Sequence, residues 1–241
     1  MTTQRTISND RRAVNNTPPI FRDRRDAGRV LALDLARHLD ASARENLQVL
    51  GLARGGVPIG WEVASFLQTP LDVCLVRKLG VPQWPELAMG AVATGGGVVL
   101  NDDLIRSLGI DDEQIRDTIG RETAELKRRE RAYRADRGPL KVVGQTVVLV
   151  DDGIATGASM TAAVRSVRQA GAAQIVVGVP VGPASACRQL LEDADQVVCS
   201  TTPADFRAVG QAFEDFHQVS DDEVRAVLAT PTSEGGTAGK P

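Results

Sequence analysis

Several features that would indicate common classes of binding site are missing from this sequence. It has only two histidines, His38 and His217, and histidines so far apart are more often structural than metal ligands. No apolar run approaches the length of a membrane span, and the N-terminal segment lacks the apolar core of a secretory signal. A net charge of −3 gives no broad basic footprint for nucleic acid. We therefore expect a cytoplasmic protein whose partners are neither membranes nor nucleic acids.

Cysteine is also scarce. The three cysteines, Cys74, Cys187 and Cys199, are an odd number, and no C-x-x-C pair occurs among them. Cys74 and Cys199 lie in apolar, strand-like runs. We predict buried free thiols in a reducing compartment.

The sequence does contain enough apolar material for one sizeable α/β domain. Of its 241 residues, 42% are hydrophobic, which allows a single core with a small appended subdomain. Residues 1–20 are polar and predict a mobile N-terminal arm. Residues 231–241 have the composition of a disordered tail. The folded domain is expected over residues 21–230.

Apolar periodicity and terminal signals divide this domain into alternating strands and helices. Strands are predicted at 47–53, 71–76, 88–94, 98–100, 146–150, 175–179 and 197–200. Helices are predicted at 27–39, 58–67 and 115–133. Three more are predicted: one follows the strand at 146–150 and ends at residue 170, one begins near residue 183, and one begins after a capping box at 220–223. The strands at 88–94 and 98–100 flank three glycines and indicate a hairpin. Repeated strand–helix–strand units favour a parallel sheet.

The most informative segment follows the strand at 146–150. Its apolar residues lead directly into two adjacent carboxylates, Asp151 and Asp152, and then into a loop of small residues before a helix. Ligands bind at the carboxyl ends of such strands, and a small-residue loop lets backbone amides surround a phosphate. Carboxylates beside a phosphate site are suited to accept hydrogen bonds from sugar hydroxyls. The segment therefore indicates a site for a ribose 5-phosphate group. The alternative is a buried strand with an ordinary capped turn, but adjacent acids at a buried strand end then lack an explanation.

This segment resembles the phosphoribosyl pyrophosphate (PRPP) signature of type I phosphoribosyltransferases, over about fourteen residues of defined type. The resemblance implies that fold: a parallel sheet flanked by helices, with a flexible hairpin loop and a small hood subdomain. It implies that Asp151 and Asp152 hold the ribose hydroxyls. It also implies that the 5-phosphate is held by Ala155, Thr156, Gly157, Ala158 and Ser159. A Walker ATP-binding loop is excluded, because Gly157 is not followed by Lys.

A second candidate loop follows the strand at 47–53. Arg54, Gly55 and Gly56 combine a forked cationic donor with two glycines that let amides approach an anion. Alone, this tripeptide is often just a turn. By the resemblance, it stands where the family binds the pyrophosphate of PRPP, and a cis peptide is expected between Ala53 and Arg54.

The third candidate is the segment 77–86, which contains glycine, two prolines and a tryptophan. This composition suits a mobile loop that closes over a site, and the resembled family carries a flexible loop at this place. Arg77 and Lys78 would then contact pyrophosphate on closure. A solvated strand end is the equal alternative.

The resemblance implies transfer of the ribose 5-phosphate group from PRPP to a nitrogen of a nucleobase-like acceptor, with release of pyrophosphate. Mg²⁺ is the expected cofactor, held mainly by PRPP and near Asp151 and Asp152, because it favours phosphate oxygens and few carboxylates. In 6-oxopurine members the first loop position is an acid, whereas here it is Ala155, which disfavours those bases. The acceptor is otherwise undefined, and a homodimer remains open.

Acceptor recognition would come from a hood built from residues 21–26 and 203–219. Phe206, Phe213 and Phe216 could stack on a base or simply pack. The alternative function is a regulator that senses PRPP or nucleotides on the same fold without transferase activity. The intact acid pair and the negative net charge favour an enzyme.

Overall fold

A computed structural model describes residues 6–9, 20–134 and 140–232 of the chain. Its strands are β1 Thr6–Asn9, β2 Leu47–Leu52, β3 Leu71–Cys74, β4 Val76–Val81, β5 Trp84–Ala93, β6 Val98–Leu100, β7 Thr146–Val150, β8 Gln174–Val181 and β9 Gln196–Thr201. Its α-helices are α1 Arg24–His38, α2 Ala41–Glu45, α3 Gly56–Leu67, α4 Asp102–Leu108, α5 Asp112–Arg134, α6 Ala158–Gln169, α7 Ala184–Gln189 and α8 Asp221–Ala229. Two 3₁₀ turns occupy Leu190–Glu192 and Val209–Ala212.

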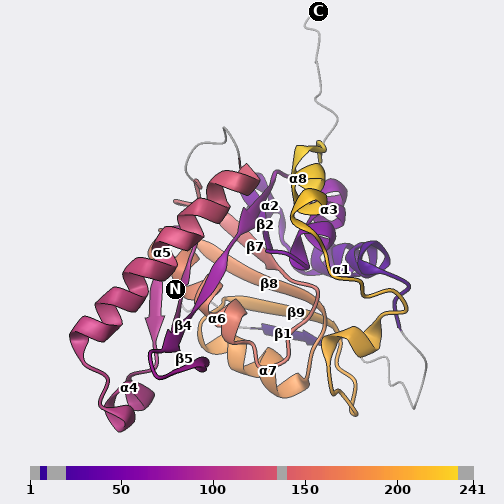
Figure 1. The fold of residues 1–241 in the computed structure, drawn as a ribbon. Coiled ribbons are helices and arrows are strands. Elements are labelled where there is room, and N and C mark those ends of the chain that lie inside the picture. Colours follow the sequence, from indigo (N-terminus) through magenta and orange to yellow (C-terminus); the bar gives the residue numbers. More distant parts are fainter. Residues whose placement is uncertain (1–5, 10–19, 135–139, 233–241) are drawn as a thin grey trace, which may run out of the picture.

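The main sheet is parallel, with strand order β1-β9-β8-β7-β2-β3 (Figure 1). Its central strand β7 is buried along its whole length, which explains why its sequence is an unbroken apolar run. Helices α1 and α3 pack together on one face, and α6 and α7 cover the other. The predicted parallel α/β architecture is confirmed.

A second, antiparallel sheet of three strands has the order β4-β5-β6. It lies between α5 and α6, which contact its strands from either side (Figure 1). The hairpin predicted around the three glycines is confirmed as β5 and β6. The strand predicted at 71–76 is in fact divided, because the chain leaves the main sheet after Cys74 and enters the second sheet at Val76. Short helices α2 and α4 lacked enough turns to show a period in the sequence.

Part of the predicted N-terminal arm forms a strand. Residues 6–9 form β1, which runs parallel to β9 at the edge of the main sheet. An edge strand can pair through its backbone without an apolar pattern, so the polar sequence of this segment did not predict a strand. Residues 1–5 and 10–19 of the predicted arm, and 233–241 of the predicted tail, lie outside the described residues.

The prediction of three free thiols was wrong for two of them. Cys187 in α7 and Cys199 in β9 form a disulfide, whereas Cys74 is a buried free thiol. Burial raises the pKa of the Cys74 thiol to about 12, so it stays protonated. The helix α7 packs directly on β9, and this packing brings together two cysteines that no sequence motif pairs. Among the described residues, no helix is long and apolar enough to cross a membrane.

Candidate functional site

The register of two neighbouring strands brings the two candidate loops together. β2 and β7 pair in parallel with Gly51 opposite Val150, so both strands end at the same level. A Cβ atom on Gly55 would lie 2.0 Å from Oδ2 of Asp152, and one on Gly56 would lie 2.4 Å from the carbonyl oxygen of Val150. Glycine is therefore required here because the loop after β2 packs directly against the acid pair.

Arg54 lies at the edge of this contact. The peptide bond between Ala53 and Arg54 is cis, as the family resemblance implied. The Nη1 atom of Arg54 lies 3.3 Å from Oδ1 of Asp221, and the Tyr133 hydroxyl donates a 2.6 Å hydrogen bond to the same oxygen. That hydrogen bond is the main cause that lowers the pKa of Asp221, while burial and Asp221 raise the pKa of Tyr133 to about 12. The start of α8 and the end of α5 thus hold the arginine in place.

The acid pair has a partner that the sequence did not reveal. Nε and Nη2 of Arg24, the first residue of α1, both lie 2.9 Å from Oδ2 of Asp152. Nη1 of the same side chain donates a 2.7 Å hydrogen bond to the carbonyl oxygen of His217, and the guanidinium lies 4.0 Å from the centre of the Phe216 ring. The two charged side chains are only 8% and 15% exposed. No local pattern distinguishes Arg24 from its neighbours Arg22 and Arg25 in the sequence.

The surroundings of the acid pair disfavour its charged form. Burial raises the pKa of Asp151 well above its usual range, and the charge of Asp152 raises it further. Burial also raises the pKa of Asp152, although the guanidinium of Arg24 opposes that effect. Hydroxyl donors or a cation placed beside this pair would stabilise its charged form. This is the behaviour expected of carboxylates that recognise a polar ligand.

The loop after the acids presents unpaired backbone amides. Gly157 has φ of +79° and turns the chain into α6, a conformation that favours glycine. Within the described part of the chain, the amides of Ala155, Thr156, Gly157 and Ser159 have no hydrogen-bond partner, and that of Ala158 has only a long contact of 3.4 Å to the Thr156 hydroxyl. Most of this loop is exposed, so an anion can reach the amides at the positive end of the helix.

Two cavities border these loops. One, of about 310 Å³, is lined by Arg24, Arg54, Gly55, Asp152 and residues 216–219. The other, of about 960 Å³, lies between the second sheet, α4 and the start of α6, and Thr156, Ser159 and Lys78 are among its lining residues. Asp152 and the pyrophosphate-loop candidate therefore share the smaller cavity, while the phosphate-loop residues Thr156 and Ser159 line the larger one.

The segment 77–86 is not an irregular loop. Arg77 and Lys78 lie in β4, which forms a hairpin with β5, so their side chains point to opposite faces. Arg77 forms an ion pair with Glu122 of α5 and does not face either candidate loop. Lys78 lines the larger cavity and pairs with Glu86. Strand alternation thus gives Arg77 and Lys78 different surroundings in this conformation, and their contact with pyrophosphate on closure stays a prediction.

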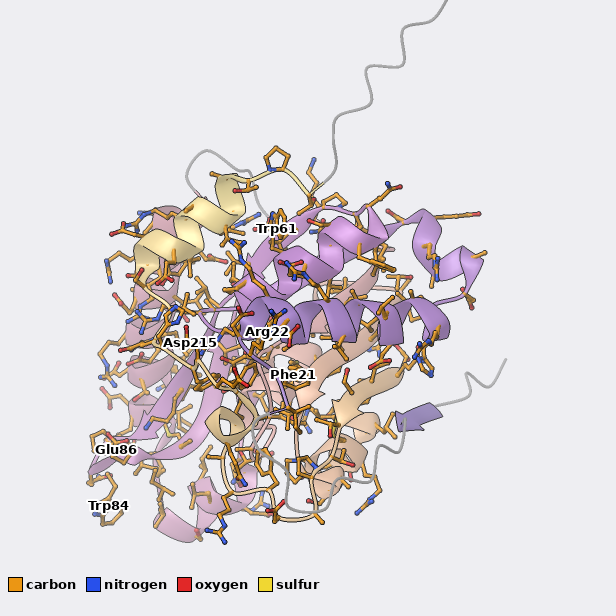
Figure 2. All side chains as sticks on the ribbon, turned by 90° about the vertical axis from the view of Figure 1, so that its right-hand side faces the viewer. Phe21, Arg22, Trp61, Trp84, Glu86 and Asp215 are labelled. Atoms are coloured by element: carbon orange, nitrogen blue, oxygen red, sulfur yellow. A yellow bond between two sulfur atoms is a disulfide. The ribbon has the colours of Figure 1, made fainter. Side chains whose placement is uncertain are left out.

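The two predicted hood segments lie side by side. The amide of Phe21 donates to the carbonyl oxygen of Ala212, and that of Asp215 donates to the carbonyl oxygen of Arg22. Phe21, Arg22 and Asp215 accordingly cluster in Figure 2, whereas Trp84 and Glu86 project from the distant tip of the β4–β5 hairpin.

Phe21, Phe213 and Phe216 form one packed row of rings in the hood. The Phe213 ring lies 5.6 Å from that of Phe21 and 4.9 Å from that of Phe216, measured between ring centres. The Phe216 ring also contacts the guanidinium of Arg24, and Phe206 packs on the core. Phe21 and Phe213 are buried, whereas Phe216 is 36% exposed and lines the smaller cavity, so stacking of Phe216 on a base stays a prediction.

Among the described residues, no group of three or more His, Cys, Asp or Glu side chains could hold a metal ion. Asp151 and Asp152 offer two carboxylates, which fits Mg²⁺ only if phosphate oxygens and water complete its shell. His217 lies between Asp215 and Glu223, and the hydrogen bond from its ring to Glu223 is the main cause that raises its pKa. Its ring therefore lies between two carboxylates at the hood surface.

A family model described as "Phosphoribosyl transferase domain" matches residues 26–216. Two relatives from Mycobacterium tuberculosis, named "Putative phosphoribosyl transferase Rv0571c" and "Putative phosphoribosyl transferase MT0597", are each 48% identical over 209 residues. The match covers 87% of this chain and 46% of each relative, so the chain spans about half their length. The crystal structure of TT1426 from Thermus thermophilus is similar with a TM-score of 0.74 and 45% identity, covering 86% of this chain and 97% of that one.

Proposed function

This chain belongs to the phosphoribosyltransferase family, and we propose that it transfers the ribose 5-phosphate group of PRPP to a nitrogen of a nucleobase-like acceptor. One observation carries the proposal. Two loops suited to anions end neighbouring parallel strands, and a buried acid pair lies between them. A molecule with a sugar between a phosphate and a pyrophosphate matches that order of groups.

Each part of the site has a task in this reaction. Asp151 and Asp152 accept hydrogen bonds from the ribose hydroxyls and so fix the sugar. The free amides from Ala155 to Ser159 bind the 5-phosphate, and Arg54 with the glycine loop binds the pyrophosphate. Holding both ends of PRPP positions the anomeric carbon for attack and supports the leaving group.

Mg²⁺ is part of the proposal as an ion brought by PRPP, and when bound it would neutralise charge on the pyrophosphate. The chain's own contribution to such an ion is limited to oxygens of the acid pair. The Arg54–Asp221 pair is partly exposed, so exchanging Asp221 for a pyrophosphate oxygen costs little. The side chain of Ala155 cannot handle a proton of the acceptor, which disfavours 6-oxopurines as substrates.

A screen for pyrophosphate release from PRPP and Mg²⁺ with a panel of nucleobases tests this function. Release that depends on one base, and that is lost in a variant carrying Asp151→Asn and Asp152→Asn, is the expected result. Binding of PRPP without turnover of any base would instead favour the regulatory alternative. Failure of the unmodified chain to bind PRPP would refute the transferase and any regulator that senses PRPP.

The assignment of Arg54 has its own test. Arg54→Ala should weaken binding of pyrophosphate and PRPP by about tenfold or more while ribose 5-phosphate binds as before, because only one end of PRPP contacts this loop. Equal losses for both ligands together with a lower melting temperature would mean that Arg54 only supports the fold.

A further inference from the structure

Oδ2 of Asp152 has no room for a sugar hydroxyl in this structure. Arg24 directs two nitrogens to that oxygen, each at 2.9 Å. On another side, the position of a Gly55 Cβ atom would be 2.0 Å away, so the pyrophosphate-loop backbone also presses on it. Within the described ranges, no other residue donates a hydrogen bond to Oδ1. One oxygen of the Asp152 carboxylate, Oδ2, is therefore already occupied, whereas Oδ1 is free to accept a hydrogen bond.

We infer that Arg24 is a positioning residue for sugar recognition, which anchors Asp152 through Oδ2 and leaves Oδ1 to accept a ribose hydroxyl. This inference rests on the proposed function. A guanidinium suits the task because its planar fork fixes the carboxylate in one orientation, which the flexible ammonium of a lysine cannot do. Burial of both side chains keeps water from competing for the same contacts.

Arg24 also connects the acid pair to the hood. Its third contact is the carbonyl oxygen of His217, and its guanidinium lies against Phe216, the last ring of the packed row. One side chain thus joins α1, the hood and the acids after β7.

The test compares ribose 5-phosphate with pyrophosphate by calorimetry. Arg24→Gln should weaken ribose 5-phosphate and PRPP by about tenfold to a hundredfold, the range of one charge-assisted hydrogen bond. Pyrophosphate alone should bind as before, because it does not contact the sugar acids. Arg24→Lys should restore only part of the loss. Arg22→Gln is the matched control, since the Arg22 side chain is 71% exposed and, within the described residues, pairs only with Asp26 in the same segment.

A double-mutant cycle separates positioning from support of the fold. If Arg24 acts through Asp152, the variant with Arg24→Gln and Asp152→Asn should bind ribose 5-phosphate no more weakly than Asp152→Asn alone. Additive losses, or an equal loss for pyrophosphate, would overturn the inference while leaving the proposed function intact. A failure of the unmodified chain to bind PRPP would overturn the proposed function first and this inference with it.

Discussion

Replacing Gly55 with alanine tests how tightly the two loops of the site depend on each other. The backbone of Gly55 has φ of −60° and ψ of −34°, which alanine adopts freely, so the effect is purely steric. The new Cβ would lie 2.0 Å from Oδ2 and 2.6 Å from Cγ of Asp152, where real contacts stay above 3.0 Å. The carboxylate must therefore shift by about 1 Å, which disturbs the geometry of its 2.9 Å contacts with Arg24.

Overpacking of this kind costs about 1–3 kcal/mol, which lowers the melting temperature of a domain of this size by roughly 2–12 °C. Urea denaturation measures the free energy of unfolding, and calorimetry measures PRPP affinity, which should fall with it. Gly120→Ala is the control, because nothing lies within 4 Å of that position in α5 and alanine should stabilise the helix by about 0.5–1 kcal/mol. Unchanged stability and unchanged affinity in Gly55→Ala would refute the packing of the loops.

Three further predictions follow from single features of the fold. Tyr133 is the only tyrosine, so ultraviolet titration should show one phenol with a pKa of about 12, and Asp221→Asn should move that pKa part of the way toward 10. Because the pKa is higher in the folded than in the unfolded protein, the stability that the Tyr133 phenol contributes is complete below pH 10 and is lost as the pH rises through 12. Reduction of the disulfide between Cys187 and Cys199, twelve residues apart, should lower the free energy of unfolding by about 3 kcal/mol, and identical urea midpoints with and without reductant would contradict the bond. Gly157→Ala places a Cβ at a φ of +79° and should cost about 1–2 kcal/mol while weakening inorganic phosphate; unaltered phosphate affinity in a titration would argue against the loop as its site.

Local chemistry made much of this molecule predictable. A buried parallel strand must be apolar on both faces, so β7 and the acids that follow it could be located from the sequence. Ser220 and Glu223 form the capping box that the sequence indicated at the start of α8. In each case the residues that define the feature are within a few positions of one another, and their own backbone decides the outcome.

Features that alternate or pair over longer distances were harder to predict. Turn residues in the segment 77–86 suggested a loop, but pairing of β4 with β5 makes it a hairpin, in which Arg77 pairs with Glu122 of α5. The cysteines looked like separate buried thiols until packing of α7 on β9 brought two of them into a bond. Composition describes each segment but not its neighbour in space.

The sequence by itself determined which strand ends carry the acids and the small-residue loops, because strand burial, turn chemistry and helix starts are local properties. Only the tertiary structure decided what surrounds them. Arg24 is 128 positions from Asp152, and Tyr133 is 88 positions from Asp221. An ion pair or hydrogen bond over such distances depends on how whole helices dock against the sheet, and that docking comes from the combined burial of many apolar residues rather than from any pattern near the charged ones.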